Sequence, residues 1–129
     1  ERTKQSFFEG ISVACTGNRI SDISHAIEEY INQFGYGIVR NYTGHGVGRE
    51  LHEDPSIPNF GAGGHGQRIV NGMTLAIEPM INLGCDKVKT LADGWTVVTA
   101  DGAKSAHYEN TIAIVDGKAV ILTDTECML

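Results

Sequence analysis

Several features are scarce or missing in this sequence of 129 residues, and each absence excludes a class of protein. Cys15, Cys85 and Cys127 are widely spaced and form no CxxC pair, so neither a disulfide framework nor a thiolate zinc site is expected. No apolar run approaches the ~18 residues of a membrane span, and no charged-then-apolar leader opens the chain. The net charge of −6 comes without a basic run. We therefore expect no membrane partner and no nucleic-acid partner, and a cytoplasmic location.

The chain has enough apolar content for one folded unit, and its first third predicts two helices. With 41% hydrophobic residues, it suits a single domain over residues 1–129. Ser21 is a good N-cap, and apolar residues follow at helical spacing until Gly35, which predicts a helix over residues 22–34. An earlier amphipathic helix is predicted over residues 4–15.

The rest of the chain predicts strands. Glycine and proline crowd residues 44–66, which favours an ordered functional loop without long regular elements. From Met73 onward the apolar period becomes two, and Asp-Gly pairs at 93–94, 101–102 and 116–117 indicate tight hairpin turns. Two helices followed by an antiparallel meander predict an α+β domain, in which the helices cover one face of the sheet.

Two acidic residues lie on or at the end of predicted strands. Along residues 73–78 apolar side chains alternate, so Glu78 projects away from the apolar side at a strand end fixed by Pro79. His107 and Glu109 are two positions apart on a later strand and must share a face. Taken singly, each is more often an ordinary polar residue on the wet face of a half-buried sheet.

Two histidines lie in the glycine-rich stretch. Glycines on both sides of His45 leave the backbone free and allow another group to approach the imidazole closely. His52 follows at a spacing that does not fit the helical HExxH zinc motif, and the glycines do not fit the phosphate-binding pattern GxGxxG. One imidazole and two carboxylates on separate elements suit Mn, Fe, Co or Zn in a hydrolytic site. The alternative to a metal ligand is that His45 is an ordinary histidine on the surface.

Three motifs in order connect these residues to a known family. They are GHGVGRELHEDP at 44–55, GMTLAIEPMIN at 72–82 and DGWTVVTADGAKSAHYENTIAI at 93–114. Together they closely resemble the C-terminal half of type I methionine aminopeptidases, which remove the initiator methionine from new proteins. The resemblance implies half of a pita-bread fold, in which two αβ halves build an antiparallel sheet around a dinuclear metal centre.

The same resemblance implies roles for individual residues. His45 would be the sole histidine ligand, Glu109 the carboxylate that bridges both ions, and Glu78 a ligand that also transfers protons. His52 would hydrogen-bond the substrate near its scissile carbonyl. Leu51 and Trp95 would line the pocket for the methionine side chain. His107 would donate a hydrogen bond to Glu109.

The family also uses two aspartates from an N-terminal half that this sequence does not contain. Three of five ligands remain, so we expect at most one ion in this chain alone, two ions (Co, Mn, Fe or Zn) in the complete enzyme, and no activity without the other half. Glu1 is not a residue that such enzymes leave after methionine, so position 1 is expected to be internal to a longer chain. The expected partners are N-terminal Met peptides, the missing half and, for the isolated chain, a second copy in a homodimer.

Two further hypotheses remain beside this one. A prolidase or aminopeptidase P relative would share the fold and the ligand types. The residues of the motifs GHGVGRELHEDP and SAHYENTI nevertheless favour the methionine enzyme. A non-catalytic peptide-binding module of pita-bread fold would not need the ligands, and their retention argues against it.

Overall fold

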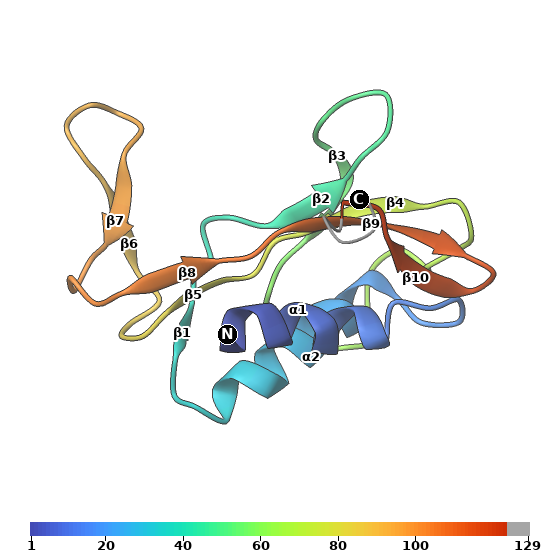
Figure 1. Cartoon of the computed structure of the whole chain (residues 1–129), viewed down its shortest axis with the longest axis horizontal. Coiled ribbons are helices and arrows are strands. Elements are labelled where there is room, and N and C mark those ends of the chain that lie inside the picture. The colour runs from blue at the N-terminus through green and yellow to red at the C-terminus, as the bar shows by residue number, and fades with distance from the viewer. Residues whose placement is uncertain (124–129) are drawn as a thin grey trace.

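The computed structural model describes residues 1–123, and two helices open the chain (Figure 1). α1 (Arg2–Ser12) and α2 (Ile20–Asn32) pack against each other beneath the sheets. α1 buries Phe7 and Gly10. A Cβ at Gly10 would press against Ile27 of α2, so glycine at this position lets the two helices approach closely.

The start of α2 differs from the sequence-based expectation. Ser21 is not the N-cap, because the helix begins at Ile20, two residues before the predicted start, and its cap is Arg19. The Ser21 hydroxyl instead accepts a hydrogen bond of 2.6 Å from the backbone N–H of His65. Asp22 accepts a bond of 2.7 Å from the backbone N–H of Arg19, which satisfies one of the free donors at the helix start. α2 ends at Asn32 with Gln33 as its C-cap, two residues before the predicted end, and Gly35, with a φ of +70°, lies in the turn that follows.

Ten short strands follow, and every pairing among the described residues is antiparallel. They are β1 (Gly37–Ile38), β2 (Gly44–Gly46), β3 (Glu53–Ile57), β4 (Thr74–Ile77), β5 (Met80–Asn82), β6 (Val88–Thr90), β7 (Val97–Thr99), β8 (Ser105–His107), β9 (Asn110–Val115) and β10 (Lys118–Ile121).

These strands form a five-stranded sheet in the order β10-β9-β4-β2-β3, a three-stranded sheet in the order β1-β5-β8 and a hairpin of β6 and β7. The α+β class is therefore confirmed. The strand order departs from a simple meander, because β4 lies between β9 and β2, which are distant from each other in sequence. This order places residues of β2, β4 and β9, which are far apart in the sequence, side by side.

Two local expectations were wrong. The glycine- and proline-rich stretch is not one loop, because β2 and β3 form within it and pair with each other. Asp101-Gly102 joins β7 to β8, which lie in different sheets, so it is not a hairpin turn. The pairs at 93–94 and 116–117 do connect paired strands. Asp116 and Gly117 both have positive φ, at 50° and 81°, which is the backbone of a type I′ turn.

The core lies between the helices and one face of the five-stranded sheet. Leu75 and Ile77 of β4 are buried with Ile112 of β9 against Ile23 and Ile27 of α2. The loop between β2 and β3 and the β6–β7 hairpin project on the side away from the helices (Figure 1). None of the helices in residues 1–123 is long and apolar enough to cross a membrane.

Candidate metal centre

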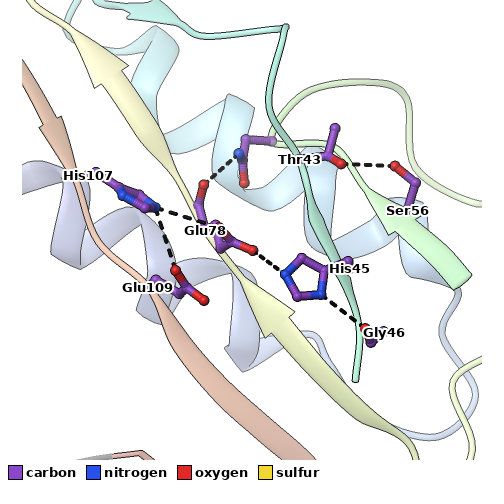
Figure 2. A network of polar contacts seen from close by, with 8 residues as sticks. Thr43, His45, Gly46, Ser56, Glu78, His107 and Glu109 are labelled. Carbon is purple, nitrogen blue, oxygen red and sulfur yellow. Dashed lines mark hydrogen bonds and ion pairs between the residues drawn. The ribbon is translucent and has the colours of Figure 1, made fainter. Parts of the chain in front are cut away.

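Strand pairing assembles the centre of the site. β4 is paired with β2 in the register His45↔Ala76 and with β9 in the register Ala76↔Thr111. Glu78 follows β4 and Glu109 precedes β9, so the three elements bring one imidazole and two carboxylates together (Figure 2). One ligand atom from each of His45, Glu78 and Glu109 lies within 4.8 Å of the others.

His45 is held by the close approach of its neighbours. Neither Gly44 nor Gly46 has a positive φ, so unusual dihedrals are not the reason for these glycines. A Cβ at Gly44 would instead collide with the backbone oxygen of Ala76, and one at Gly46 with that of Asp54. The adjacent strands can therefore approach β2 closely enough to bury the imidazole.

The imidazole presents one nitrogen to the site. Nδ1 of His45 lies 3.0 Å from the carbonyl oxygen of Gly46, so the tautomer protonated at Nδ1 donates a hydrogen bond there. Its Nε2 then carries a lone pair and lies 2.7 Å from Oε2 of Glu78. A hydrogen-bonded Nδ1 with a free Nε2 is the usual arrangement of a metal-binding histidine.

The carboxyl group of Glu78 lies in an environment that opposes its charge. Desolvation is the largest cause that raises the pKa of Glu78, and the nearby charge of Glu109 raises it further; His45 and His107 act in the opposite direction. Oε2 of Glu78 is buried and, in spite of the short contact with His45, has no hydrogen bond of proper geometry. A cation at this point would relieve both the repulsion and the missing partner.

The donor set fits a divalent ion. One imidazole nitrogen and two carboxylates are the ligand types that Zn, Mn, Fe and Co accept, and among residues 1–123 no cysteine joins this group to select a softer metal. The buried, unpartnered Oε2 of Glu78 points to the same conclusion, because a cation would supply the partner that it lacks.

His107 stands beside both carboxylates. Its Nε2 lies 3.8 Å from Oε1 of Glu78 and 4.0 Å from Oε1 of Glu109 (Figure 2). These distances are longer than hydrogen bonds, so His107 contributes an electrostatic contact without a direct bond in this arrangement.

His52 is close to the centre, whereas Leu51 is not enclosed. The His52 ring centroid lies 4.0 Å from that of His45, and both line an open hollow of about 670 Å³ between the β2–β3 loop and the sheet. Leu51 is next to His52 on this loop and is 73% exposed. The described residues therefore provide no walls around the Leu51 side chain.

Trp95 lies on the loop of the β6–β7 hairpin and is 82% exposed. A single tryptophan is usually part of a core, and this one is not. It borders an open hollow of about 500 Å³ together with Tyr42 and Met80. The structure does not bring Trp95 and Leu51 into one closed pocket within residues 1–123.

Sequence reasoning missed three residues at the site. Tyr42 and Met80 line the hollow beside Trp95, and the alternation of apolar residues gave no signal for them. Asn59 is fully buried and donates a hydrogen bond to the backbone oxygen of Glu78. A polar residue after Pro58 is an unremarkable sequence feature, so only the tertiary contact identifies Asn59.

Comparison with known proteins bears on this site. A methionine aminopeptidase of Clostridium acetobutylicum is 58% identical over 121 residues, which cover 94% of this chain and 48% of the relative. The crystal structure of a methionine aminopeptidase from Thermotoga maritima matches with a TM-score of 0.92 and 48% identity, covering 95% of this chain and 49% of that one. A prolidase from Pyrococcus furiosus matches with a TM-score of 0.68 at 24% identity, over 95% of this chain and 31% of the prolidase, which shows a shared fold alone.

This chain spans about half the length of the curated relatives that it matches. The resemblance to the C-terminal half of methionine aminopeptidases and the half pita-bread fold are thereby confirmed. The model of metallopeptidase family M24 matches residues 1–116. Since that match covers most of its 129 residues, this chain belongs to metallopeptidase family M24.

Proposed function

We propose that this chain is the C-terminal half of the catalytic domain of a methionine aminopeptidase, forming one folded unit over residues 1–129. The observation that carries the proposal is the cluster of His45, Glu78 and Glu109 in a chain 58% identical to such an enzyme. The complete protein would remove the N-terminal methionine of nascent proteins, which are made in the cytosol. The weaker identity to prolidases, at 24%, favours the methionine enzyme over that alternative.

His45, Glu78 and Glu109 would hold the metal of this half. The complete enzyme would hold two divalent ions, drawn from Co, Mn, Fe or Zn, with further ligands from the other half. When bound, such ions polarise a carbonyl oxygen and lower the pKa of water, which supplies the chemistry of hydrolysis. This chain alone would bind one ion at most, because three ligands leave a second ion unsupported.

The remaining residues would bind and orient the substrate. Burial and the neighbouring charge of Glu109 raise the pKa of Glu78 toward the range useful for proton transfer, so Glu78 would also serve as the base. His52, beside His45, would donate a hydrogen bond near the scissile carbonyl. Leu51 and Trp95 would contact the methionine side chain, which would then be enclosed by the other half.

His107 would stabilise the two carboxylates without binding the metal. Its Nε2 is near Oε1 of both Glu78 and Glu109, so an N–H group at Nε2 would lie beside both carboxylates. A small movement of the ring would give a hydrogen bond to Glu109.

Reconstitution of activity tests this proposal. The chain is combined with its N-terminal half, and release of methionine from a Met-Ala-Ser peptide is measured with Mn(II). We expect release by the reconstituted enzyme, none by this chain alone, and loss of most activity in His45→Ala and Glu109→Gln. Glu29→Gln, which changes an exposed carboxylate on α2, is the control. Wild-type rates in either ligand variant would rule the assignment out.

Metal titration of the isolated chain is a second test. Calorimetry with Mn(II) or Co(II) should detect one weak site at most. Two tight sites in this chain would show that the ligand count is wrong.

A homodimer would form from the isolated chain where the other half is absent. Leu83, Val120 and Leu122 are large apolar side chains that remain exposed, and such surfaces favour association. Because the two halves of the fold are related by a pseudo-twofold, a second copy would occupy the place of the missing half. Sedimentation over a concentration series measures this, and a monomer at all concentrations would contradict it.

A further inference from the structure

Asn59 connects the two elements that carry His45 and Glu78. It lies two residues beyond the end of β3, which pairs with β2 in the register His45↔Ser56. The Nδ2 group of Asn59 donates a hydrogen bond of 3.0 Å to the backbone carbonyl of Glu78. The Asn59 side chain is 0% exposed, so this bond is shielded from water. It joins the strand pair that holds the imidazole to the segment that holds the carboxylate.

Glu78 needs such a bond because the strand ladder is interrupted there. β4 is paired as far as Ile77↔Asn110, and pairing resumes only at Met80↔His107 in the other sheet. The intervening Pro79 has no N–H group to donate. Buried backbone carbonyls require a donor, and the amide of Asn59 supplies one at this junction.

The oxygen atom of the Asn59 amide also indicates that this residue is present for its bond to Glu78. Oδ1 of Asn59 is buried and has no hydrogen-bond partner among residues 1–123. An unsatisfied buried acceptor is unfavourable, and an apolar side chain of the same size would avoid this penalty. The presence of asparagine is therefore explained by its bond to Glu78 and not by its contribution to packing.

We propose that Asn59 is a positioning residue of the metal centre, which fixes Glu78 relative to His45 through the Glu78 backbone. It touches neither the metal nor the substrate. The inference deepens the proposed function and rests on it for the identity of the ligands. Without the bond, the Glu78 junction can relax, and the spacing of Nε2 of His45 and Oε2 of Glu78, now 2.7 Å, is no longer maintained.

The test uses the full-length protein, in which this chain is joined to its N-terminal half. Asn59→Leu removes the amide and keeps the branching and the number of side-chain heavy atoms. Asn82→Leu is a matched control, because Asn82 is also 0% exposed, also donates from Nδ2 to a backbone carbonyl, that of Cys85, and also has an unpartnered Oδ1. Its bond holds a turn and makes no contact with a ligand residue.

Two readouts separate positioning from general stability. Calorimetry measures Mn(II) affinity, and the visible absorption of the Co(II)-loaded protein reports the ligand geometry. We expect Asn59→Leu to weaken Mn(II) binding about 10- to 100-fold and to change the Co(II) spectrum. Asn82→Leu should lower thermal stability to a similar extent but leave the Mn(II) affinity and the Co(II) spectrum unchanged.

A milder pair of variants covers the case in which leucine prevents folding. Asn59→Ser retains a polar group that ends short of the Glu78 carbonyl and should weaken Mn(II) binding, whereas Asn82→Ser should not. Unchanged affinity and spectrum in the folded Asn59 variants, or an equal loss in the Asn82 variants, would overturn the proposal. Wild-type protein that binds Mn(II) but releases no methionine would refute the proposed function alone, because the Asn59 result depends only on metal binding.

Discussion

Two parts of the glycine-rich stretch use glycine for opposite reasons. In the strand segment that carries His45, Gly44 has an ordinary φ and is needed because a Cβ would collide with the backbone of β4. In the loop that follows, Gly61 and Gly64 have φ values of +125° and +80°, and a Cβ there would meet nothing within 4 Å. The first segment requires close approach between strands, whereas the second requires an unusual backbone.

The acidic residues beside these two segments differ in the same way. Asp22, which fastens the loop to α2, accepts hydrogen bonds from the backbone N–H groups of Arg19 and Gly64, and these bonds lower the pKa of Asp22. Glu78, beside the strand segment, has its pKa raised by burial and by Glu109. Charge at Asp22 therefore stabilises the fold, whereas charge at Glu78 is maintained against its surroundings, as expected of a functional site.

The largest expected loss of stability is at Gly44, and it distinguishes this glycine, required for close approach of strands, from the loop glycines with positive φ. Gly44→Ala should destabilise the full-length protein by about 3 kcal/mol, because β2 must move away from β4 to admit the methyl group. The displaced His45 should also bind Mn(II) more weakly. Urea denaturation and calorimetric titration measure the two effects.

The matched variant is Gly64→Ala in the neighbouring loop. It should cost only about 1 kcal/mol, from the unfavourable positive φ, and leave Mn(II) binding intact. If the two alanine variants lost stability and metal affinity equally, the distinction between the segments would be wrong.

The next effect concerns Asp22. Asp22→Ala removes two acceptors from backbone N–H groups and should cost about 1–2 kcal/mol at pH 7. Since the folded pKa of Asp22 lies below its ordinary value of 3.8, the stabilisation is complete above that pH and is lost as the pH falls through the folded pKa. The difference in stability between wild type and variant should therefore be larger at pH 7 than at pH 3, as measured by denaturation curves at the two pH values. Glu29→Ala, on the exposed side of α2, should show little change at either pH.

The sequence predicted the elements of this fold where local patterns decide them. The apolar spacing of α2 and the alternation of β4 located the helix and the orientation of Glu78, and the family motifs named the residues that the structure brings together. Ser21 was misassigned as an N-cap because its true partner, the N–H of His65, is distant in sequence. Asn59 was missed for the same reason, since its bond to Glu78 exists only after β3 and β4 enter one sheet.

A smaller effect is expected at Glu78, in the opposite direction to Asp22. Because the folded pKa of Glu78 is raised, its ionisation in the fold is unfavourable, and stability is lost as the pH rises above the ordinary value of 4.5. Glu78→Gln should remove this loss and stabilise the metal-free protein at pH 7 by less than about 1 kcal/mol, while it weakens Mn(II) binding. Thermal melts in the presence of a chelator measure the gain. A metal-free variant less stable than wild type would contradict the assigned pKa shift.

The smallest expected effect on stability is at the loops that face away from the helices. Trp95 is 82% exposed within the described residues, so Trp95→Ala should change the free energy of unfolding, followed by circular dichroism, by less than about 0.5 kcal/mol. Its contact is expected with the methionine side chain, and the variant should therefore raise KM for Met-Ala-Ser while kcat stays close to wild type. Leu51→Ala should behave in the same way.

A single tryptophan also gives a direct measure of the same surface. In this chain without its other half, the fluorescence of its single tryptophan, Trp95, should be quenched readily by acrylamide. A loss of more than about 1 kcal/mol in Trp95→Ala would mean that the ring is packed in the full-length protein, since exposed substitutions rarely cost so much. In that case the β6–β7 hairpin contributes to the stability of the fold, as the strands around His45 do. If stability is unchanged and KM rises, the β6–β7 hairpin contacts the substrate but does not support the fold. Its position would then depend on the N-terminal half that covers it.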